Sequence, residues 1–423
     1  MLPFSTASGS WNDPLVALFT STSAVCVTGL IVVDTGTAFS TFGQLVILLL
    51  IQIGGLGYMT LSTFLMLLIG RRFDLSQKLA IKESFDQPYN QGSRKLIQSI
   101  IATTLIGEIA GIFLLYIRFG QDFGTSTGLW LSIFHSISAW NNAGFSLFAN
   151  SLVGYQHSWI VNLVIPALVI CGGIGYEVII EFYLWLKHRR KRQLRKFNFS
   201  LNFMVVTRTT FWLLVLGTIA FLFVEWGNDS TLAPMGSLAD KGLAAWFQSM
   251  TTRTAGFNSI DIGKMTTAGL FITMGLMFIG ASPSGTGGGI KTTTLSILAN
   301  CTFSVLRGRN YVTIRRREIP YGIVLKAIAV VFGSATVITI STAIISVNSP
   351  EINLIDVLFE VISAFATVGL STGITASLSV PGKLAIICTM YCGRVGVLLL
   401  MSALLGDADP QRVNYPEENL LVG

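Results

Sequence analysis

Long apolar runs alternate with short polar loops along the whole chain. About 20 apolar residues are enough to cross the hydrocarbon core of a membrane as a helix. Runs of at least this length occupy residues 39–69, 95–118, 159–186, 203–225, 265–306, 321–346 and 379–405, and polar residues interrupt the fifth of them. The pattern predicts an all-α polytopic membrane protein.

Shorter semi-apolar stretches lie between these runs, and four of them are similar in sequence. They read "TSAVCVTGL" at 22–30, "ISAWNNAGF" at 137–145, "SMTTRTAGF" at 249–257 and "ISAFATVGL" at 362–370. The shared glycines are separated by 115, 112 and 113 residues, and an aromatic residue stands ten positions before each (Phe19, Phe134, Trp246 and Phe359). A near-constant period of this kind indicates a duplicated unit.

The unit consists of a spanning helix, a short re-entrant helix, a glycine turn and a second spanning helix. It divides the chain into repeats at residues 1–70, 71–190, 191–306 and 307–423. Only 28 residues precede the first shared glycine, so the first repeat lacks its leading helix. Either the sequence is truncated at its start or the first repeat is incomplete, and we expect truncation.

The four glycine turns predict a pore. Non-helical backbone survives at membrane depth only where protein buries it or where it lines water. Four such loops that converge on one axis can present carbonyl oxygens that replace the hydration shell of a cation. A single glycine of this kind is more often a helix cap or a packing residue. Four glycines in register favour the pore.

The charge distribution supports a membrane topology. The net charge is +7, and of 28 Lys and Arg residues 20 lie in the windows 71–95, 187–208 and 307–326. The loops near 119–129, 227–242 and 347–355 carry almost none. Basic loops of membrane proteins lie on the cytoplasmic side. The re-entrant stretches then lie on the outer side. Topology alone explains the basic segments, so nucleic-acid binding is not needed to account for them. Binding of an acidic cytoplasmic partner or of anionic lipid stays open as a second role of these segments.

Composition and motifs argue against an enzyme. Charged residues make up 12% of the chain and hydrophobic residues 52%, whereas soluble domains carry about 25% charged residues. The five cysteines show no metal-ligand spacing. The segment "GTGGGIKTTT" has a superficial likeness to a phosphate-binding loop, but Ile290 replaces the glycine that such a loop requires before its lysine, and no strand leads into it.

The fourfold pattern, together with "SAVCVTGLIVVDTGTAFSTFGQ", "QIGGLGYMT" and "GGGIKTTT", resembles the membrane subunit of the Trk/Ktr/HKT cation transporters, and the chain is similar in length to the bacterial KtrB branch. The resemblance covers nearly the whole chain. It implies four repeats around one pore in the cytoplasmic membrane, a homodimer, and potassium uptake that is often sodium-dependent. It also implies a cytosolic KtrA-like ring of RCK domains as regulator, which would bind nucleotide in place of this chain.

The resemblance also assigns a potassium filter. A serine at the first-repeat glycine is associated with sodium preference in this family, and this chain has Gly29 there, so we predict potassium preference. Because only the glycine matches in all four loops, we expect a less uniform coordination of the ion than in a channel of four identical chains. The filter residues are Val27, Thr28, Gly29, Asn142, Ala143, Gly144, Thr254, Ala255, Gly256, Thr367, Val368 and Gly369.

The polar interruption of the fifth run predicts a gate. The stretch "GASPSGTGGGIKTTT" at 280–294 lies between two apolar segments, while "QIGGLGYMT" and "CGGIGYEV" in the first two repeats stay apolar. We therefore predict that only the third repeat has a broken second helix, and that residues 282–291 form a flexible gate below the filter. Its candidate residues are Ser282, Ser284, Gly285, Thr286, Gly287, Gly288, Gly289 and Lys291.

Ionisable residues within apolar segments usually mark function or internal pairing. Arg394 lies in the middle of the last run, and the resemblance assigns it to the gate, facing the broken helix. Lys291 either binds the freed carbonyls or forms a movable barrier. Arg253 is expected to clamp the filter loop through Asp261 or Asp240. Four further expectations are internal pairing of Glu108, an ion pair of Glu181 with "KHRRKR", a structural His135, and a role in the outer mouth or in turn capping for Asp34, Asn142 and Asp261.

An alternating-access carrier is the alternative interpretation, because internal repeats and broken helices also occur in secondary transporters. Such repeats are often inverted, whereas these four are parallel. The parallel repeats favour the pore, and a carrier coupled to Na⁺ or H⁺ stays open as the second candidate function.

Overall fold

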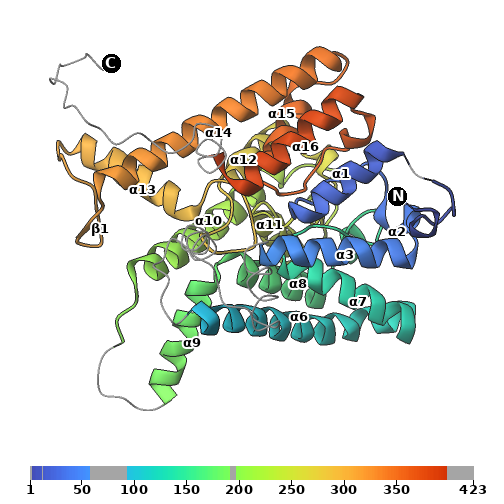
Figure 1. Ribbon diagram of the computed structural model, residues 1–423, viewed down its shortest axis with the longest axis horizontal. Helices are drawn as coiled ribbons and strands as arrows, with labels where there is room; N and C mark the ends of the chain where they lie inside the picture. The colour runs from blue at the N-terminus through green and yellow to red at the C-terminus, as the bar shows by residue number, and fades with distance from the viewer. Residues whose placement is uncertain (1, 12, 58–92, 191–196, 398–423) are drawn as a thin grey trace.

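The chain folds almost entirely into helices (Figure 1). The computed structural model describes residues 2–11, 13–57, 93–190 and 197–397. Within them, three helices are long and apolar enough to cross a membrane, at Gln98–Phe123, Leu201–Glu225 and Tyr321–Asn348, and a bent pair gives a fourth if it counts as one span. The fold class predicted from the sequence, an all-α polytopic membrane protein, is confirmed.

The helices follow the order of the predicted repeats. The first group is α1 (Pro14–Val25), α2 (Thr35–Ala38) and α3 (Thr41–Leu56), and the second is α6 (Ser93–Phe123), α7 (Thr125–Trp140), α8 (Trp159–Gly173) and α9 (Tyr176–Arg190). The third is α10 (Leu201–Glu225), α11 (Leu238–Thr251), α12 (Thr267–Phe278) and α13 (Thr292–Leu306), and the fourth is α14 (Tyr321–Asn348), α15 (Leu354–Phe365) and α16 (Val380–Val395). Short 3₁₀ turns occupy Pro3–Ser5, Val153–Tyr155, Ile262–Lys264 and Thr375–Ser377, and strands β1 (Thr313–Ile314) and β2 (Arg317–Glu318) form a small hairpin.

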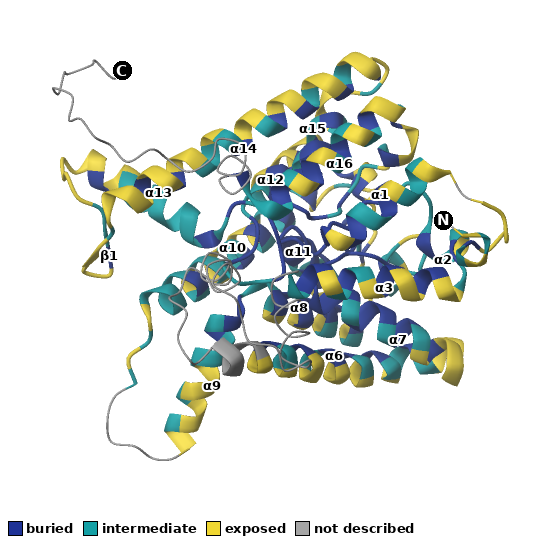
Figure 2. Ribbon diagram, in the orientation of Figure 1, coloured by how far each residue is buried: buried dark blue, intermediate teal, exposed yellow. Residues whose placement is uncertain are grey.

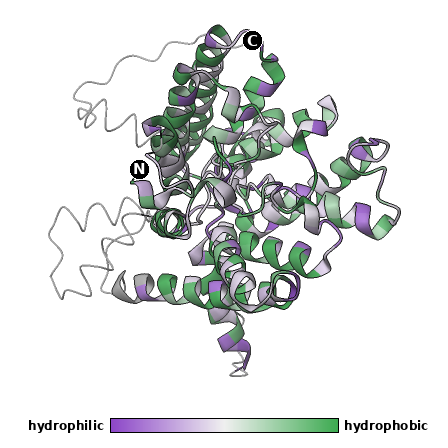
Figure 3. Ribbon diagram, turned by 90° about the vertical axis from the view of Figure 1, so that its right-hand side faces the viewer, coloured by the Kyte–Doolittle hydropathy of each residue, from purple (hydrophilic) through white to green (hydrophobic). Residues whose placement is uncertain are grey.

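Hydrophobic side chains cover the outside of this molecule. Phe113, Phe223 and Phe332 on the long helices α6, α10 and α14 are 77%, 86% and 76% exposed. Figure 2 shows buried residues around the central α11 and exposed residues along the outer helices, and Figure 3 shows hydrophobic residues along most of the helix length. A soluble surface rarely presents so much apolar area. The outer face is therefore the surface that lipid covers.

The basic residues define the sides of the molecule. The end of α9, with Arg189 and Arg190, and the β1–β2 hairpin, with Arg315 to Arg317 beside it, lie at one end of the molecule in Figure 1, opposite the N-terminal segment and α2. Positive charge marks the cytoplasmic side, so α2 lies on the outer side. The basic window at 71–95 lies almost entirely outside the described residues.

The second helix of the second repeat is also broken, so the prediction of a break in the third repeat alone is wrong. The run 159–186 consists of α8 and α9, which meet at an angle of 102°. Gly57, Gly175 and Gly396 follow α3, α8 and α16 with φ of +77°, +95° and +92°. Glycine adopts a positive φ without steric cost, so it can end a helix. Because a single glycine adds no polar residue to an apolar run, the sequence pattern does not reveal such a break. Of the two breaks that the structure describes on both sides, the one in the third repeat has the longer connection, residues 279–291.

The short re-entrant helices α1, α7, α11 and α15 are called pore helices below. A second glycine precedes Gly57, Gly175 and Gly396 by three residues and packs against the pore helix of its repeat. A Cβ atom on Gly54, Gly172 or Gly393 would lie 2.0, 1.9 or 1.7 Å from the carbonyl oxygen of Val25, Trp140 or Phe365, respectively. Each of these oxygens belongs to the last residue of the pore helix in the same repeat. Direct backbone contact therefore joins the second helix to the pore helix in three repeats.

Substitution of Gly172 by alanine should destabilise the protein. The added methyl group must displace backbone, so we expect a loss of about 1–3 kcal/mol of stability, as for other overpacked sites. The matched control is Gly275→Ala, because Gly275 lies in α12 with open space around it. Thermal denaturation of the detergent-solubilised protein measures both variants. Equal stability of the two would contradict the contact.

Candidate functional site: four filter loops and the loop beneath them

The four filter loops share one unusual backbone conformation. Their first residues, Val27, Asn142, Thr254 and Thr367, have φ of +58°, +58°, +64° and +51°, and their glycines, Gly29, Gly144, Gly256 and Gly369, have φ of +89°, +69°, +74° and +90°. The residue between them has negative φ in each loop. A positive φ is an outlier for a β-branched residue and marks functional sites. Alternating signs of φ turn successive carbonyl groups toward the same side of the loop, which suits the coordination of a cation.

The four glycines form a closed ring. A Cβ atom on Gly29 would lie 2.3 Å from the carbonyl oxygen of Ala143 in the second loop, and one on Gly144 would lie 2.8 Å from that of Ala255 in the third. The same relation joins Gly256 to Val368 at 2.3 Å and Gly369 back to Thr28 at 2.1 Å. The loops therefore surround one axis in the order of the sequence, and the first and third repeats lie opposite each other, as do the second and fourth.

An equivalent backbone hydrogen bond joins each filter loop to its pore helix. The amides of the middle filter residues donate to the carbonyl oxygens of Ser23, Ser138, Thr251 and Ser363 over 2.8, 2.8, 3.0 and 2.8 Å. In this register Thr251 precedes its glycine by five residues, and the others precede theirs by six. The third repeat is thus one residue shorter between pore helix and filter.

Because of this missing residue, the aromatic residue of the third pore helix that is equivalent to Phe19, Phe134 and Phe359 lies nine positions before its glycine and not ten. The fully buried ring four residues before Thr251 is Phe247, and Trp246 is partly exposed. Phe19, Phe134 and Phe359 stand four residues before the equivalent serines and are also fully buried. The prediction of Trp246 as the equivalent residue is wrong, because the third repeat has one residue fewer between this ring and its glycine.

A cavity of about 810 Å³ opens above the glycine ring on the outer side. Its lining includes the four filter glycines, Asp34 of the first repeat and Asp261 of the third. The Asp34 carboxylate accepts hydrogen bonds from the amide and hydroxyl of Thr37, and that of Asp261 pairs with Lys264 over 3.2 Å. Both carboxylates therefore cap turns and also face the outer mouth.

The connection between α12 and α13 lies against the inner end of the filter. The Thr286 hydroxyl donates to Asn142 Oδ1 over 3.0 Å, and the Gly288 amide donates to Thr367 Oγ1 over 3.0 Å. A Cβ atom on Gly287 would lie 2.0 Å from Thr254 Oγ1. The loop thus contacts the first filter residue of three repeats. Asn142, which the sequence placed near the outer mouth, directs its side chain to this inner loop.

Two cations hold the loop. The Arg394 guanidinium donates to the carbonyl oxygens of Thr286 in the loop and of Gly54 at the end of α3, so it joins the fourth, third and first repeats. Lys291 Nζ donates to the Gly287 oxygen over 2.8 Å, which closes the loop on itself. Of the two roles expected for Lys291, the binding of freed carbonyls matches this contact.

Other predicted loop residues make local contacts. The Ser282 amide donates to the Gly173 oxygen over 3.0 Å, its hydroxyl bonds that of Thr292, and the Ser284 oxygen accepts from the Tyr176 amide over 3.2 Å. The Gly285 amide donates back to the Ser282 oxygen over 3.2 Å, and Gly289 turns the chain with φ of +69°. The second repeat therefore supports the loop from the side of α8 and α9.

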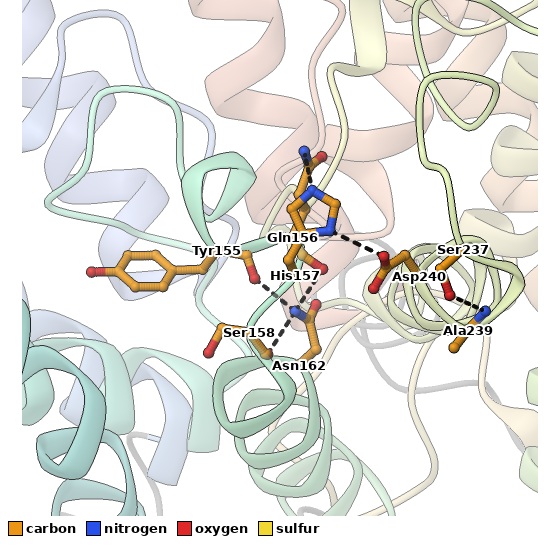
Figure 4. A network of polar contacts seen from close by, with 8 residues as sticks. All are labelled: Tyr155, Gln156, His157, Ser158, Asn162, Ser237, Ala239 and Asp240. Atoms are coloured by element: carbon orange, nitrogen blue, oxygen red, sulfur yellow. Dashed lines mark hydrogen bonds and ion pairs between the residues drawn. The ribbon is translucent and has the colours of Figure 1, made fainter.

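Arg253 has a carbonyl partner, so the prediction of a carboxylate partner is wrong. Its Nη2 donates to the oxygen of Gly280 over 3.1 Å. Asp240, in the first turn of α11, faces His157 at 3.5 Å (Figure 4), and Asp261 pairs with Lys264. The arginine therefore joins the shortened end of α11 to the start of the connecting loop.

The remaining ionisable residues are held inside the helix bundle. Glu108 Oε1 accepts from Asn141 Nδ2 over 3.1 Å, which is the expected internal pairing. His135 is fully buried and bonded through both ring nitrogens. Glu181 accepts from the amide and hydroxyl of Ser200. Among the residues that the structure describes, Glu181 has no ion pair with the basic segment. Residues 191–196 of that segment lie outside the described residues.

Sequence reasoning missed a buried carboxylate, Glu360, in the fourth pore helix. It follows the buried ring of Phe359 directly, as His135 follows Phe134. Alignment of the pore helices by their buried rings would have found it.

These features define a class: a helical membrane protein whose four re-entrant loops form one cation pathway. The family model for TrkH, described as a cation transport protein, matches residues 4–405. The chain belongs to this family, which is one of transport proteins and not of enzymes.

Several characterised proteins are similar to the chain. It is 38% identical to Ktr system potassium uptake protein B of Bacillus subtilis, over 100% of this chain and 92% of that protein. It is 40% identical to the protein of the same name from Vibrio alginolyticus, over 96% and 88%, and 36% identical to the potassium/sodium uptake protein NtpJ of Enterococcus hirae, over 100% and 92%. The crystal structure of the potassium transporter TrkH from Vibrio parahaemolyticus has the same fold, with a TM-score of 0.72 at 17% identity over 93% of this chain and 78% of that one.

Proposed function

We propose that the protein takes up potassium ions across the cytoplasmic membrane through the four filter loops. The observation that carries this proposal is the ring of four glycines with a common backbone conformation. A ring of carbonyl oxygens from four loops suits a monovalent cation that has lost its water. The names of the similar potassium uptake proteins support potassium as the substrate. Each repeat, at 1–70, 71–190, 191–306 and 307–423, supplies one quarter of this pathway.

We further propose that residues 282–291 act as the gate, together with Arg394. The proposal is supported by the contacts of this loop with Asn142, Thr254 and Thr367, the first residues of three filter loops. A permeating ion has to pass this level, so the loop must move for transport to occur. Its bonds to Arg394 and Lys291 favour the closed position.

Three finer features belong to the same proposal. Sodium dependence is supported by the similarity to a potassium/sodium uptake protein. A KtrA-like ring of RCK domains, which would carry the nucleotide, is supported by relatives that are named as components of a Ktr system. A homodimer is the expected assembly, because the family resemblance implies it.

Growth and flux experiments test the function. Expression of the chain in a bacterium that lacks its own potassium transporters should restore growth at limiting potassium, and addition of a KtrA-like partner and sodium should strengthen the rescue. Purified protein in liposomes should take up potassium along its gradient. Absence of potassium flux in both systems would contradict the proposal.

The second candidate is a coupled carrier. The broken second helices of the second and third repeats favour it, because discontinuous helices are typical of alternating-access transporters. A fixed ratio of potassium to a co-transported Na⁺ or H⁺, at slow and saturable turnover, would support the carrier. Uptake that follows the potassium gradient without a fixed ratio would support the gated pore.

A further inference from the structure

The pore helices carry a polar residue at the same buried position. The residue that follows the buried ring of each pore helix is Thr20, His135, Gln248 or Glu360, and these side chains are between 0% and 3% exposed. None of the four residues lines the cavity above the glycine ring. Buried polar groups are costly unless they are hydrogen-bonded. Their partners therefore show what the position does.

In the second repeat this residue is tied to the chain just beyond the filter. His135 Nε2 lies 3.0 Å from the hydroxyl of Ser146, and Nδ1 lies 2.8 Å from the Leu131 oxygen. Because a carbonyl only accepts, Nδ1 donates, and the Ser146 hydroxyl donates to Nε2 of a neutral ring. Ser146 stands two residues after Gly144.

In the fourth repeat a different residue makes the same connection. The Glu360 carboxylate accepts hydrogen bonds from the hydroxyl of Ser371, over 2.9 Å, and from that of Thr375. Ser371 stands two residues after Gly369, as Ser146 stands two residues after Gly144. The Ser371 hydroxyl also lies 3.0 Å from that of Thr375. The carboxylate therefore joins the pore helix to the outgoing segment at two points.

The other two repeats lack this bridge. Ile31, two residues after Gly29, has an apolar side chain. Gln248 Nε2 of the third repeat points to the Met265 sulfur at 3.8 Å. The bridge thus occurs in the second and fourth repeats, which lie opposite each other across the axis in the order of the glycine ring.

We propose that His135 and Glu360 are positioning residues that set the width of the filter at its outer end, and through it the preference for potassium over sodium. Each fixes the segment beyond its glycine to a rigid pore helix, so that Gly144 and Gly369 keep their distance across the axis. Filter geometry decides how well carbonyl oxygens replace the water of one cation against that of another. This inference rests on the proposed potassium uptake.

The test compares potassium and sodium flux through purified variants in liposomes. Glu360→Ala removes both acceptors, and Ser371→Ala removes one donor without changing the pore helix. We expect Ser371→Ala to lower the potassium-to-sodium flux ratio by about tenfold, the effect of one hydrogen bond of ordinary strength, and Glu360→Ala to lower it by at least as much. Glu360→Gln keeps an acceptor and should restore most of the ratio. The double variant should lose less than the product of the single effects, because both act on one bridge.

The control is Gln248→Leu, which changes the equivalent residue of a repeat without the bridge and should leave the flux ratio as it is. If Glu360→Ala does not fold, as judged by size-exclusion chromatography, Ser371→Ala and Ser146→Ala decide the question. Unchanged ratios in folded Glu360→Ala, or in Ser371→Ala and Ser146→Ala, would overturn the positioning role. Absence of potassium flux in the unmodified protein would instead contradict the proposed function.

Discussion

Substitution of Gly29 by serine should lower the preference for potassium over sodium by about 10- to 100-fold, which corresponds to the displacement of one or two ion ligands. The Cβ atom would lie 2.3 Å from the Ala143 oxygen and 3.2 Å from the Gly144 Cα atom, and the backbone has φ of +89°. Serine therefore pushes the neighbouring loop away from the axis and strains its own. The flux ratio of the two ions in liposomes measures the effect.

The control for this substitution is Gly308→Ser. Gly308 also has positive φ, at +63°, but a Cβ atom there would meet nothing within 4 Å. It should keep the ion preference of the unmodified protein. If Gly29→Ser folds and retains its potassium preference, the assignment of Gly29 to the filter is wrong.

Deletion of residues 284–290 should raise potassium flux by about tenfold or more, because the deletion removes the hydrogen bonds from Thr286 and Gly288 to the filter, each of ordinary strength. The ends of the deleted segment are close in space. Ser282 and Thr292 share a hydrogen bond of 3.0 Å between their hydroxyl groups, and the Ala281 oxygen accepts from the Thr292 amide. Pro283 can therefore join Lys291 with little change elsewhere. Flux into liposomes, with and without the regulatory partner, measures both the rate and its control.

A smaller change tests the same loop. Arg394→Gln removes the charged donor to the Thr286 and Gly54 oxygens, and should raise flux less than the deletion does. Arg309→Gln, at an exposed arginine near the β1–β2 hairpin, is the control. Reduced flux in the folded deletion variant would show that the loop is a structural plug that the pathway requires, and would contradict the gate.

The four glycine turns are visible in the sequence because their backbone demands glycine. A positive φ at Gly29, Gly144, Gly256 and Gly369, with a neighbouring backbone in contact, leaves no other residue type, so the positions recur visibly in the chain. The class of fold is equally visible, since spanning helices require long apolar runs.

Other features of the site leave little trace in the sequence. One missing residue before Gly256 shifts the spacing and led to Trp246 in place of Phe247. A helix break at Gly175 needs a single glycine within an apolar run. The partner of Arg253 is the backbone oxygen of Gly280, and any residue type supplies a backbone oxygen. Contacts of this kind depend on how the repeats meet, which spacing along the chain does not determine.

The four filter loops belong to one chain and differ in their side chains, and the third is shorter by one residue. In a pore of four identical subunits every mutation changes all walls together, and a harmful one is repeated four times. In this chain a mutation alters one filter loop and leaves the other three unchanged. Natural selection can therefore adjust ion preference in small steps, one loop at a time. The third loop, with one residue fewer and a long inner connection, already differs from the other three in this way.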